Sequence, residues 1–251
     1  MKGILLSVLI FGACAPAVAT RETPTAPVTP AASGATTAQL VLPRETHWFR
    51  NSAEYQAIAL ETYRTAAARI AQLAQGRQPG TWAVILDADE TVLDNSEYQK
   101  RLAQNGGSYS DATWNAWVRE RAAPAIPGAV EFLATVRRLG GRIAIVTNRD
   151  DEVCADTRAN LDRLTLTPDA VLCRVNRVSD KNPRFEAVAR GTAVPGVPAV
   201  EVLMWVGDNI QDFPRMSQAS RTDPAALAPF GDRWFMLPNP MYGSFESNPH
   251  R

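Results

Sequence analysis

The chain has 251 residues, of which 45% are hydrophobic and 21% charged, and a chain of this size can bury one substantial core. Its 26 basic residues balance 26 acidic ones, so the overall charge favours neither a nucleic-acid polymer nor an anionic membrane surface as a partner. Any selectivity must therefore come from a local site on one main domain.

The N-terminus has the pattern of an export signal over residues 1–19. Lys2 precedes an apolar run at residues 4–11 that is too short to span a bilayer. Two cleavage patterns compete: residues 17–19 form an A-x-A site for ordinary signal peptidase, whereas residues 12–14 resemble the small-small-Cys end of a bacterial lipobox. We expect an exported protein, either an outer-membrane lipoprotein with its lipid on Cys14 or a periplasmic protein cleaved after Ala19.

Residues 20–44 are rich in Thr, Pro and Ala and contain few large apolar side chains. Such a composition buries too little surface to offset the entropy lost when the chain is ordered. We expect a flexible tether there, followed by one domain at residues 45–251.

Short apolar runs with the length and composition of buried strands recur along this domain. They lie at residues 82–86, 142–146, 202–206 and 233–237. Helical patterns alternate with these runs, and this alternation predicts an α/β fold with a doubly wound, mainly parallel sheet.

Two helices are predicted with their ends. Asn51 is expected to cap a long amphipathic helix that continues to Leu73. A second helix follows Pro127 and ends at the glycine pair 140–141. The polar segment 94–125 interrupts the alternation, and we expect it to form a small helical cap together with residues 45–78.

Polar side chains gather where the predicted strands end. They are Asp87, Asp89, Thr147, Asn148, Asp208 and Asp212. In a doubly wound sheet, ligands bind beyond the carboxyl ends of the strands. We therefore expect the functional site at that edge of the sheet.

Residues 87–91 read Asp-Ala-Asp-Glu-Thr directly after a predicted buried strand. This order brings the carboxylates of Asp87 and Asp89 to one sheet edge, where like charges are costly unless a cation lies beside them. A divalent metal would remove that cost. Taken alone, the pentapeptide is equally compatible with an acidic turn in which Thr91 acts as a cap.

The later strands are followed by hydrogen-bond donors and further carboxylates. Thr147 and Asn148 can donate to phosphate oxygens, and Lys181 can place a compact positive charge on them. Asp208 and Asp212 are spaced i and i+4 and share a face if a helical turn begins there. Hard oxygen ligands of this kind suit Mg²⁺. Each donor also has an ordinary alternative, a helix cap for the Thr-Asn pair and a solvated surface position for the lysine.

In their order and their positions after strands, these elements resemble the phosphatases of the haloacid-dehalogenase superfamily. A closer resemblance, to the class C acid phosphatases, rests on five stretches. They are residues 51–56 (NSAEYQ), 87–96 (DADETVLDNS), 146–149 (VTNR), 206–213 (VGDNIQDF) and 238–246 (PNPMYGSFE). That family includes outer-membrane lipoproteins of the lipoprotein e type, which act as 5′-nucleotidases. Ala88 and Phe245 depart from the pattern, because they stand where Leu and Trp are expected.

The resemblance implies a Mg²⁺-dependent phosphomonoesterase in which Asp87 is the nucleophile and forms an aspartyl-phosphate. It implies that Asp89 protonates the leaving group as general acid and then activates water. Mg²⁺ would be held by the carboxylates of Asp87 and Asp208 and the backbone carbonyl of Asp89, while Asp212 would orient its waters. The phosphate oxygens would be bound by Thr147, Asn148 and Lys181.

The aromatic residues favour a nucleoside 5′-monophosphate as the small-molecule substrate. Trp114 in the expected cap and Tyr242 in a glycine-hinged turn are predicted to stack on the base, with Phe245 as a third contact. Trp117 is expected to pack inside the cap. Two alternatives remain: a binding or storage lipoprotein that has lost turnover, and a phosphotransferase or mutase of the same superfamily.

Beyond the export signal the sequence contains two cysteines, Cys154 and Cys173. They can form a disulfide in an oxidising compartment, but two buried free thiols are equally compatible with the sequence. The two histidines, His47 and His250, lie in no recognisable phosphatase motif, and no Cys-x5-Arg loop surrounds either cysteine. Phosphatase chemistry that depends on histidine or cysteine is therefore not expected.

Overall fold

The computed structural model describes residues 41–250. The predicted export signal, both cleavage patterns, Cys14 and most of the predicted tether lie outside the described residues. Within residues 41–250, no helix is both long enough and apolar enough to cross a bilayer.

The core of the domain is a parallel sheet of five strands in the order β3-β2-β1-β4-β5. The strands are β1 (Trp82–Leu86), β2 (Arg142–Asp150), β3 (Ala170–Arg174), β4 (Glu201–Gly207) and β5 (Trp234–Met236). The chain builds outward from β1 to β3, then returns to place β4 on the other side of β1. The strand order reverses there, and the doubly wound α/β fold is confirmed.

Two strands differ from the prediction. β2 continues to Asp150 instead of ending at residue 146, because the polar residues of its second half have partners outside the strand. β3, residues 170–174, was not predicted at all. It has only four apolar residues before Arg174 and lies at the edge of the sheet, where a short parallel strand gives a weak signal.

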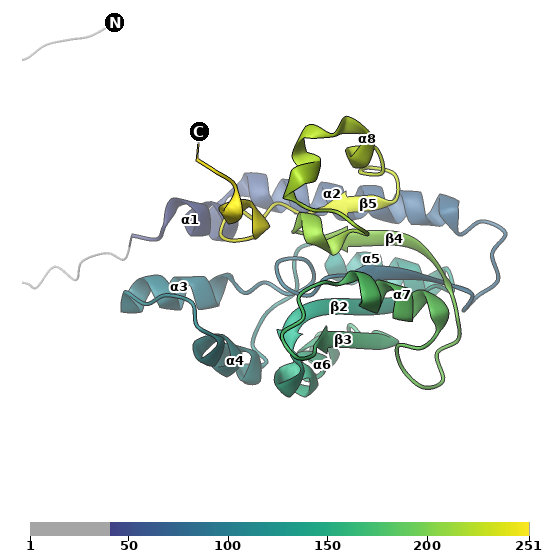
Figure 1. The fold of residues 1–251 in the computed structure, drawn as a ribbon, viewed down its shortest axis with the longest axis horizontal. Coiled ribbons are helices and arrows are strands. Elements are labelled where there is room, and N and C mark those ends of the chain that lie inside the picture. Colours follow the sequence, from purple (N-terminus) through teal and green to yellow (C-terminus); the bar gives the residue numbers. More distant parts are fainter. Residues whose placement is uncertain (1–40, 251) are drawn as a thin grey trace, which may run out of the picture. The chain divides into compact units, whose positions relative to one another are not determined.

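Helices cover both faces of the sheet (Figure 1). On one face lie α2 (Ala53–Leu73), α5 (Ala129–Arg138) and α6 (Cys154–Arg163). On the other lies α7 (Asn182–Arg190), which is drawn in front of the sheet in Figure 1. The domain therefore has the three layers expected of a doubly wound fold.

Side chains along β1 alternate between the two faces. Trp82, Val84 and Leu86 pack in the cluster with α2, α5 and α6, whereas Ala83 and Ile85 pack in the cluster with α7. All five side chains are buried. This explains why the strand reads as a continuous apolar run, since a central parallel strand is covered on both faces.

The long helix α2 begins one residue later than predicted. Ser52, in an extended conformation, is the cap, and its Oγ accepts a hydrogen bond from the N–H of Tyr55 (3.0 Å). Asn51, predicted as the cap, is instead the last residue of α1 (Arg44–Asn51). The serine hydroxyl satisfies one of the free N–H groups of the first turn.

Three helices stand over the carboxyl ends of the strands: α1, α3 (Ser96–Asn105) and α4 (Asp111–Glu120). The first two pack on each other, and Arg50 of α1 forms an ion pair with Glu97 of α3 (3.0 Å). Although residues 45–78 were assigned to the cap as a whole, α2 packs on α5 and β5 of the core. We use "cap" below for α1, α3 and α4.

The remaining elements are short. They are α8 (Pro224–Leu227) and the 3₁₀ helices η1 (Asp151–Val153), η2 (Ile210–Asp212), η3 (Gln218–Thr222) and η4 (Ser244–Ser247). Of these, η2 and η4 lie close to the site described below.

A disulfide joins Cys154 at the start of α6 to Cys173 in β3, with 5.9 Å between the two Cα atoms. It resolves the alternative that the sequence left open between paired and free thiols. Because it ties the edge strand to the helix that covers it, it should stabilise the edge of the sheet.

Candidate active site

Asp87 stands at the carboxyl end of β1, and its N–H donates to the carbonyl of Val206 in β4 (3.0 Å). The chain then turns back sharply, because the N–H groups of Val92 and Leu93 both donate to the carbonyl of Ala88 (2.9 and 2.8 Å). Glu90 adopts a positive φ of 49° within this turn. The turn thus presents Asp87 and the residues after it at the edge of the sheet, as the motif predicted.

The first turn also reaches the second acidic segment. Thr91 Oγ1 donates to Asp208 Oδ1 (3.1 Å), and Asn239 Nδ2 donates to Asp208 Oδ2 (2.9 Å). Asp208 follows β4 directly, and Asn239 follows β5. The carboxylate of Asp208 is therefore oriented by residues from both sides.

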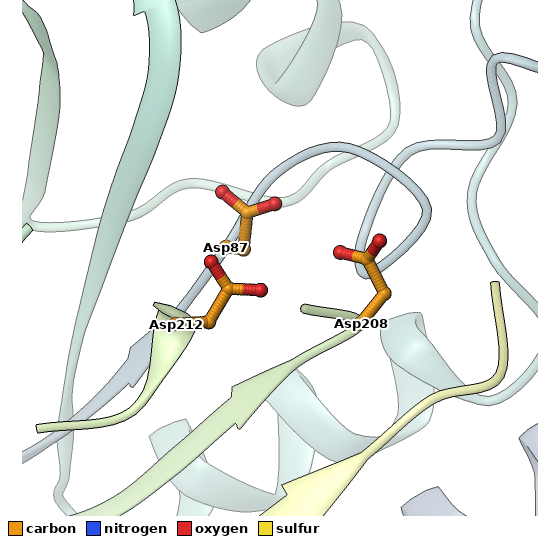
Figure 2. A group of neighbouring side chains, drawn as sticks. All are labelled: Asp87, Asp208 and Asp212. Carbon is orange, nitrogen blue, oxygen red and sulfur yellow. The ribbon is translucent and has the colours of Figure 1, made fainter. Parts of the chain in front are cut away.

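Three carboxylates converge at this edge. Asp87, Asp208 and Asp212 each offer an oxygen, and these oxygens lie within 4.8 Å of one another. Figure 2 shows the three side chains pointing toward a shared space. The helical turn on which the i, i+4 prediction depended does not begin at Asp208, since η2 covers only Ile210–Asp212, but Asp208 and Asp212 still lie together. Asp87 and Asp212 are buried, and Asp208 is half-buried.

Lys181 is buried among these carboxylates. Its Nζ contacts Asp87 Oδ1 and lies 2.7 Å from Asp212 Oδ1. Burial alone would lower the pKa of Lys181, but the attraction of Asp212 and Asp87 outweighs it and raises the pKa above its usual value. Lys181 therefore stays positively charged, at the position where the sequence predicted a cation for the phosphate.

The positive charge of Lys181 does not balance the acidic cluster. Burial raises the pKa of Asp87 to about 7, with Lys181 opposing and Asp212 and Asp89 reinforcing the rise. Burial, together with Asp212 and Asp87, also raises the pKa of Asp208 well above its usual value. Among residues 41–250, Lys181 is the only cationic side chain that pairs with any of these three carboxylates.

The cluster fits a small divalent cation. Its donors are hard carboxylate oxygens, which suit Mg²⁺, and its uncompensated negative charge is what a divalent ion would neutralise. Asp212 already has both oxygens engaged, Oδ1 by Lys181 and Oδ2 by the N–H of Asn209 (2.8 Å). Asp208 also accepts hydrogen bonds at both oxygens, but only from neutral donors, and Lys181 contacts only Oδ1 of Asp87. Asp87 and Asp208 therefore stay the predicted direct ligands.

Asp89 lies apart from this cluster, on the cap side. Its Oδ1 accepts hydrogen bonds from Arg149 Nε (2.9 Å) and Asn95 Nδ2 (2.9 Å). Arg149 Nη2 lies 2.8 Å from the same oxygen. These contacts all fall on one oxygen of the carboxyl group, and Asp89 lines the cavity described next.

A cavity of about 740 Å³ opens over the carboxylates and is bounded by the cap. Asp87, Asp89, Asn148, Lys181, Asp208 and Asp212 line it, as do Trp114 and Tyr242. Thr147 and Phe245 do not. Thr147 is fully buried and its Oγ1 accepts from the N–H of Arg149 (3.1 Å), whereas 43% of Phe245 is exposed to solvent.

The two aromatic residues of the cavity differ in their surroundings. The Trp114 ring lies over the guanidinium of Arg149, 5.6 Å from its Cζ, and Tyr98 packs edge-on at 5.1 Å. Tyr242 is half-buried, and its hydroxyl is enclosed without a hydrogen-bond partner among the described residues.

Several residues of the site have no predicted role. Arg184 donates to the Thr147 carbonyl (2.5 Å) and to Asn148 Oδ1 (2.6 Å), which orients the asparagine amide. Asn95 and Arg149 hold Asp89. Arg149 stands between polar residues at positions 147–151, so its local sequence gives no signal that its side chain is buried.

Comparisons with known proteins agree with this geometry. Residues 14–245 match the protein family described as HAD superfamily, subfamily IIIB (acid phosphatase). Two structures of the class C acid phosphatase from Bacillus anthracis, one with tungstate bound, are similar to this chain. Each has a TM-score of 0.71 and 29% identity, and covers 80% of this chain and 85% of that one.

A curated relative is more distant. The stem 31 kDa glycoprotein of Glycine max is 26% identical over 171 residues, which is 63% of this chain. The match spans 58% of the length of that protein.

Proposed function

Since the chain belongs to the acid phosphatases of HAD subfamily IIIB, a family of phosphomonoesterases, we propose that it hydrolyses phosphomonoesters with Mg²⁺ through an aspartyl-phosphate on Asp87. We propose nucleoside 5′-monophosphates as its preferred substrates. The observation that carries the proposal is the convergence of Asp87, Asp208 and Asp212 beside Lys181 at the floor of the cavity. The tungstate bound by the Bacillus anthracis relative, a tetrahedral oxyanion like phosphate, supports the same reading.

Asp87 is the proposed nucleophile because its carboxylate lies at the cavity floor, at the end of a rigid central strand. Lys181 contacts Oδ1, one oxygen of the pair, and so fixes the carboxylate while carrying positive charge at the place where phosphate oxygens would arrive. Attack on phosphorus divides one difficult displacement into two easier steps, formation and hydrolysis of the aspartyl-phosphate.

Asp89 is the proposed general acid. Its Oδ1 is occupied by Arg149 and Asn95, so Oδ2 is the oxygen on which a transferable proton would reside. In the first step Asp89 would protonate the leaving oxygen, and in the second, now ionised, it would deprotonate the attacking water.

The ion would be held by the carboxylates of Asp87 and Asp208 and by the backbone carbonyl of Asp89, with Asp212 placed to accept from its waters. When bound, Mg²⁺ supplies positive charge that offsets the repulsion between the nucleophile and an anionic substrate. Asn148, oriented by Arg184, and Lys181 are proposed to contact the remaining phosphate oxygens. Thr147 stays a predicted phosphate contact, but it is fully buried and does not line the cavity.

The proposed nucleotide preference rests on the two aromatic residues that line the cavity, Trp114 and Tyr242. Trp114 is half-buried and has the Arg149 guanidinium against its ring, which holds it as a stacking surface. Phe245 lies in η4, three residues after Tyr242, and does not line the cavity. It therefore remains a proposed outer contact.

The experiment compares three forms of the purified protein on a panel of phosphomonoesters: wild type, Asp87→Asn and Asp162→Asn. Asp162 is an exposed aspartate of α6, so it makes the same chemical change outside the site. Asp87→Asn should retain less than about a tenth of wild-type activity, a barrier increase above about 1.4 kcal/mol, while Asp162→Asn retains full activity. If Asp87→Asn keeps a tenth or more, the nucleophile assignment is wrong.

The cofactor is tested on the wild-type protein. A chelator should abolish turnover and added Mg²⁺ should restore it, and calorimetric titration of the chelated protein with Mg²⁺ should show a binding heat that Asp208→Asn lacks. Full activity after exhaustive chelation would exclude the metal.

Export and attachment are a separate proposal. We propose that the protein leaves the cytoplasm and that Cys14 carries a lipid. Cys14→Ser should then release the protein from membranes or block its processing. Mass spectrometry of the wild-type protein decides between the two cleavage patterns, because an unmodified N-terminus at Thr20 would indicate ordinary secretion.

A further inference from the structure

Arg149, in β2, is the largest charged side chain that is almost completely buried, with 1% of its surface exposed. Each of its three nitrogens has a protein acceptor: Nε and Nη2 contact Asp89 Oδ1, Nη2 donates to Asn95 Oδ1 (3.0 Å), and Nη1 donates to Thr157 Oγ1 (3.3 Å). A buried guanidinium is costly unless it is paired. Among residues 41–250 its one acidic partner is Asp89, so the pair is the feature that requires an explanation.

Asn95 completes the arrangement and is also fully buried. Its Nδ2 donates to Asp89 Oδ1 (2.9 Å), and its Oδ1 accepts from Arg149 Nη2 and from Trp117 Nε1 (2.9 Å). Two donors on one atom and a carboxylate on the other fix the orientation of this amide. A continuous chain of hydrogen bonds therefore runs from Trp117 in α4 of the cap to Asp89.

Arg149 lines the cavity, but its guanidinium is committed to the protein. A phosphate ligand would need donors directed into the cavity, whereas these nitrogens are directed at Asp89, Asn95 and Thr157. The contacts of Arg149 therefore indicate that it holds Asp89 in place rather than binding phosphate.

We propose that Arg149 and Asn95 are positioning residues for Asp89, and that Trp117 supports them from the cap. By occupying Oδ1 from two sides, they hold the carboxyl group in one orientation and leave Oδ2 as the oxygen that transfers the proton. This inference rests on the proposed role of Asp89 as general acid. It gives Trp117, predicted to be a packing residue, a role that its packing alone does not supply.

The test compares Trp117→Phe with Trp82→Phe. Both indoles are buried, but the Trp117 N–H donates to Asn95, whereas the Trp82 N–H has no hydrogen-bond partner among the described residues. Trp82 opens β1 at the end of the strand away from Asp87. Arg149→Lys, which keeps the charge but loses the planar fork, and Asp89→Asn complete the set.

The readout is the ratio of kcat/KM for an alkyl phosphate to that for a nitrophenyl phosphate. A good leaving group needs little protonation, so loss of the acid lowers this ratio, whereas general loss of folded protein lowers both values together. We expect the ratio to fall about 100-fold or more in Asp89→Asn, about tenfold in Arg149→Lys and several-fold in Trp117→Phe. Trp82→Phe should leave it unchanged.

The outcomes separate the inference from the function on which it rests. If Asp89→Asn lowers kcat/KM equally for both substrates, the general-acid role itself is wrong. If Asp89→Asn lowers the ratio while Trp117→Phe behaves like Trp82→Phe, the positioning role of the network is wrong. Should Arg149→Lys fail to fold, the comparison of the two tryptophan variants decides, because each removes the same atoms from a buried position.

Discussion

The disulfide between Cys154 and Cys173 offers a prediction whose size follows from the structure. The bond closes a segment with a sequence separation of 19 residues. Loop-closure entropy for that length corresponds to about 3 kcal/mol in the free energy of unfolding. Replacing both cysteines by alanine should therefore destabilise the domain by about that amount, because the unfolded chain regains its freedom.

Equilibrium unfolding in urea, followed by tryptophan fluorescence, measures the effect. Each single variant is kept under reducing conditions and compared with the oxidised wild-type protein. Its free energy of unfolding should fall nearly as much as that of the double variant, since either substitution breaks the same cross-link. The two single losses should thus fail to add, with a coupling energy of about 3 kcal/mol between the two positions. The reduced wild-type protein is the matched control and should resemble the double variant.

Two results would refute this reasoning. A loss below about 1 kcal/mol in the double variant would mean that the cross-link restricts the unfolded chain far less than its length implies. Additive losses in the two single variants would mean that each cysteine contributes separately through its packing, because Cys173 is buried in the core and Cys154 packs against it.

Two further predictions concern specificity and the start of α2. Trp114→Ala should cost about 1–3 kcal/mol in transition-state binding of a nucleoside monophosphate, and leave a ringless phosphate ester nearly unchanged. The ratio of the two kcat/KM values measures it, and parallel losses would make Trp114 a packing residue. Ser52→Ala should lower the free energy of unfolding by about 1 kcal/mol through loss of the helix cap, with Asn51→Ala as the control. Equal losses in the two variants, measured by urea unfolding, would contradict the cap at Ser52.

The general fold was predictable because it depends on repeated, local patterns. The strands at residues 82–86 and 202–206 are covered on both faces, so they read as unbroken apolar runs with a polar residue at the end. Their parallel pairing brings Asp87 and Asp208 to the same edge, and the structure brings these carboxylates together as expected. The parallel fold that the sequence predicted therefore also explains why the two acidic motifs lie close together.

The parts that were missed depend on contacts between distant residues. β3 has a short apolar run, and its place in the sheet is set by pairing with β2 and by the disulfide rather than by its own sequence. Likewise, Thr147 and Arg149 extend β2 beyond its apolar part because the Thr147 carbonyl accepts from Arg184 and the Arg149 guanidinium pairs with Asp89, and both partners lie outside the strand. A prediction from local sequence patterns ends the strand at the first polar residue, because such patterns contain no information about partners far along the chain.

The same limit applies within the site. The sequence identified the acidic residues by their motif, but it gave no role to Asn95 or Arg149, because only the folded chain brings both of them against Asp89. It also placed Phe245 with Trp114 and Tyr242, because the glycine-hinged turn does not reveal which of its aromatic residues faces the cavity. Of the two aromatic residues in that turn, only Tyr242 lines the cavity.

The most direct test of the central claim is to trap the phosphoryl group on the protein. Wild-type enzyme would be mixed with a radiolabelled phosphomonoester, quenched in acid within one turnover, digested and mapped by mass spectrometry. We predict a label that hydroxylamine releases, as expected of an acyl phosphate, on the peptide containing Asp87, and no label in Asp87→Asn. A label on any other residue, or a label of equal amount in Asp87→Asn, would contradict the proposed mechanism.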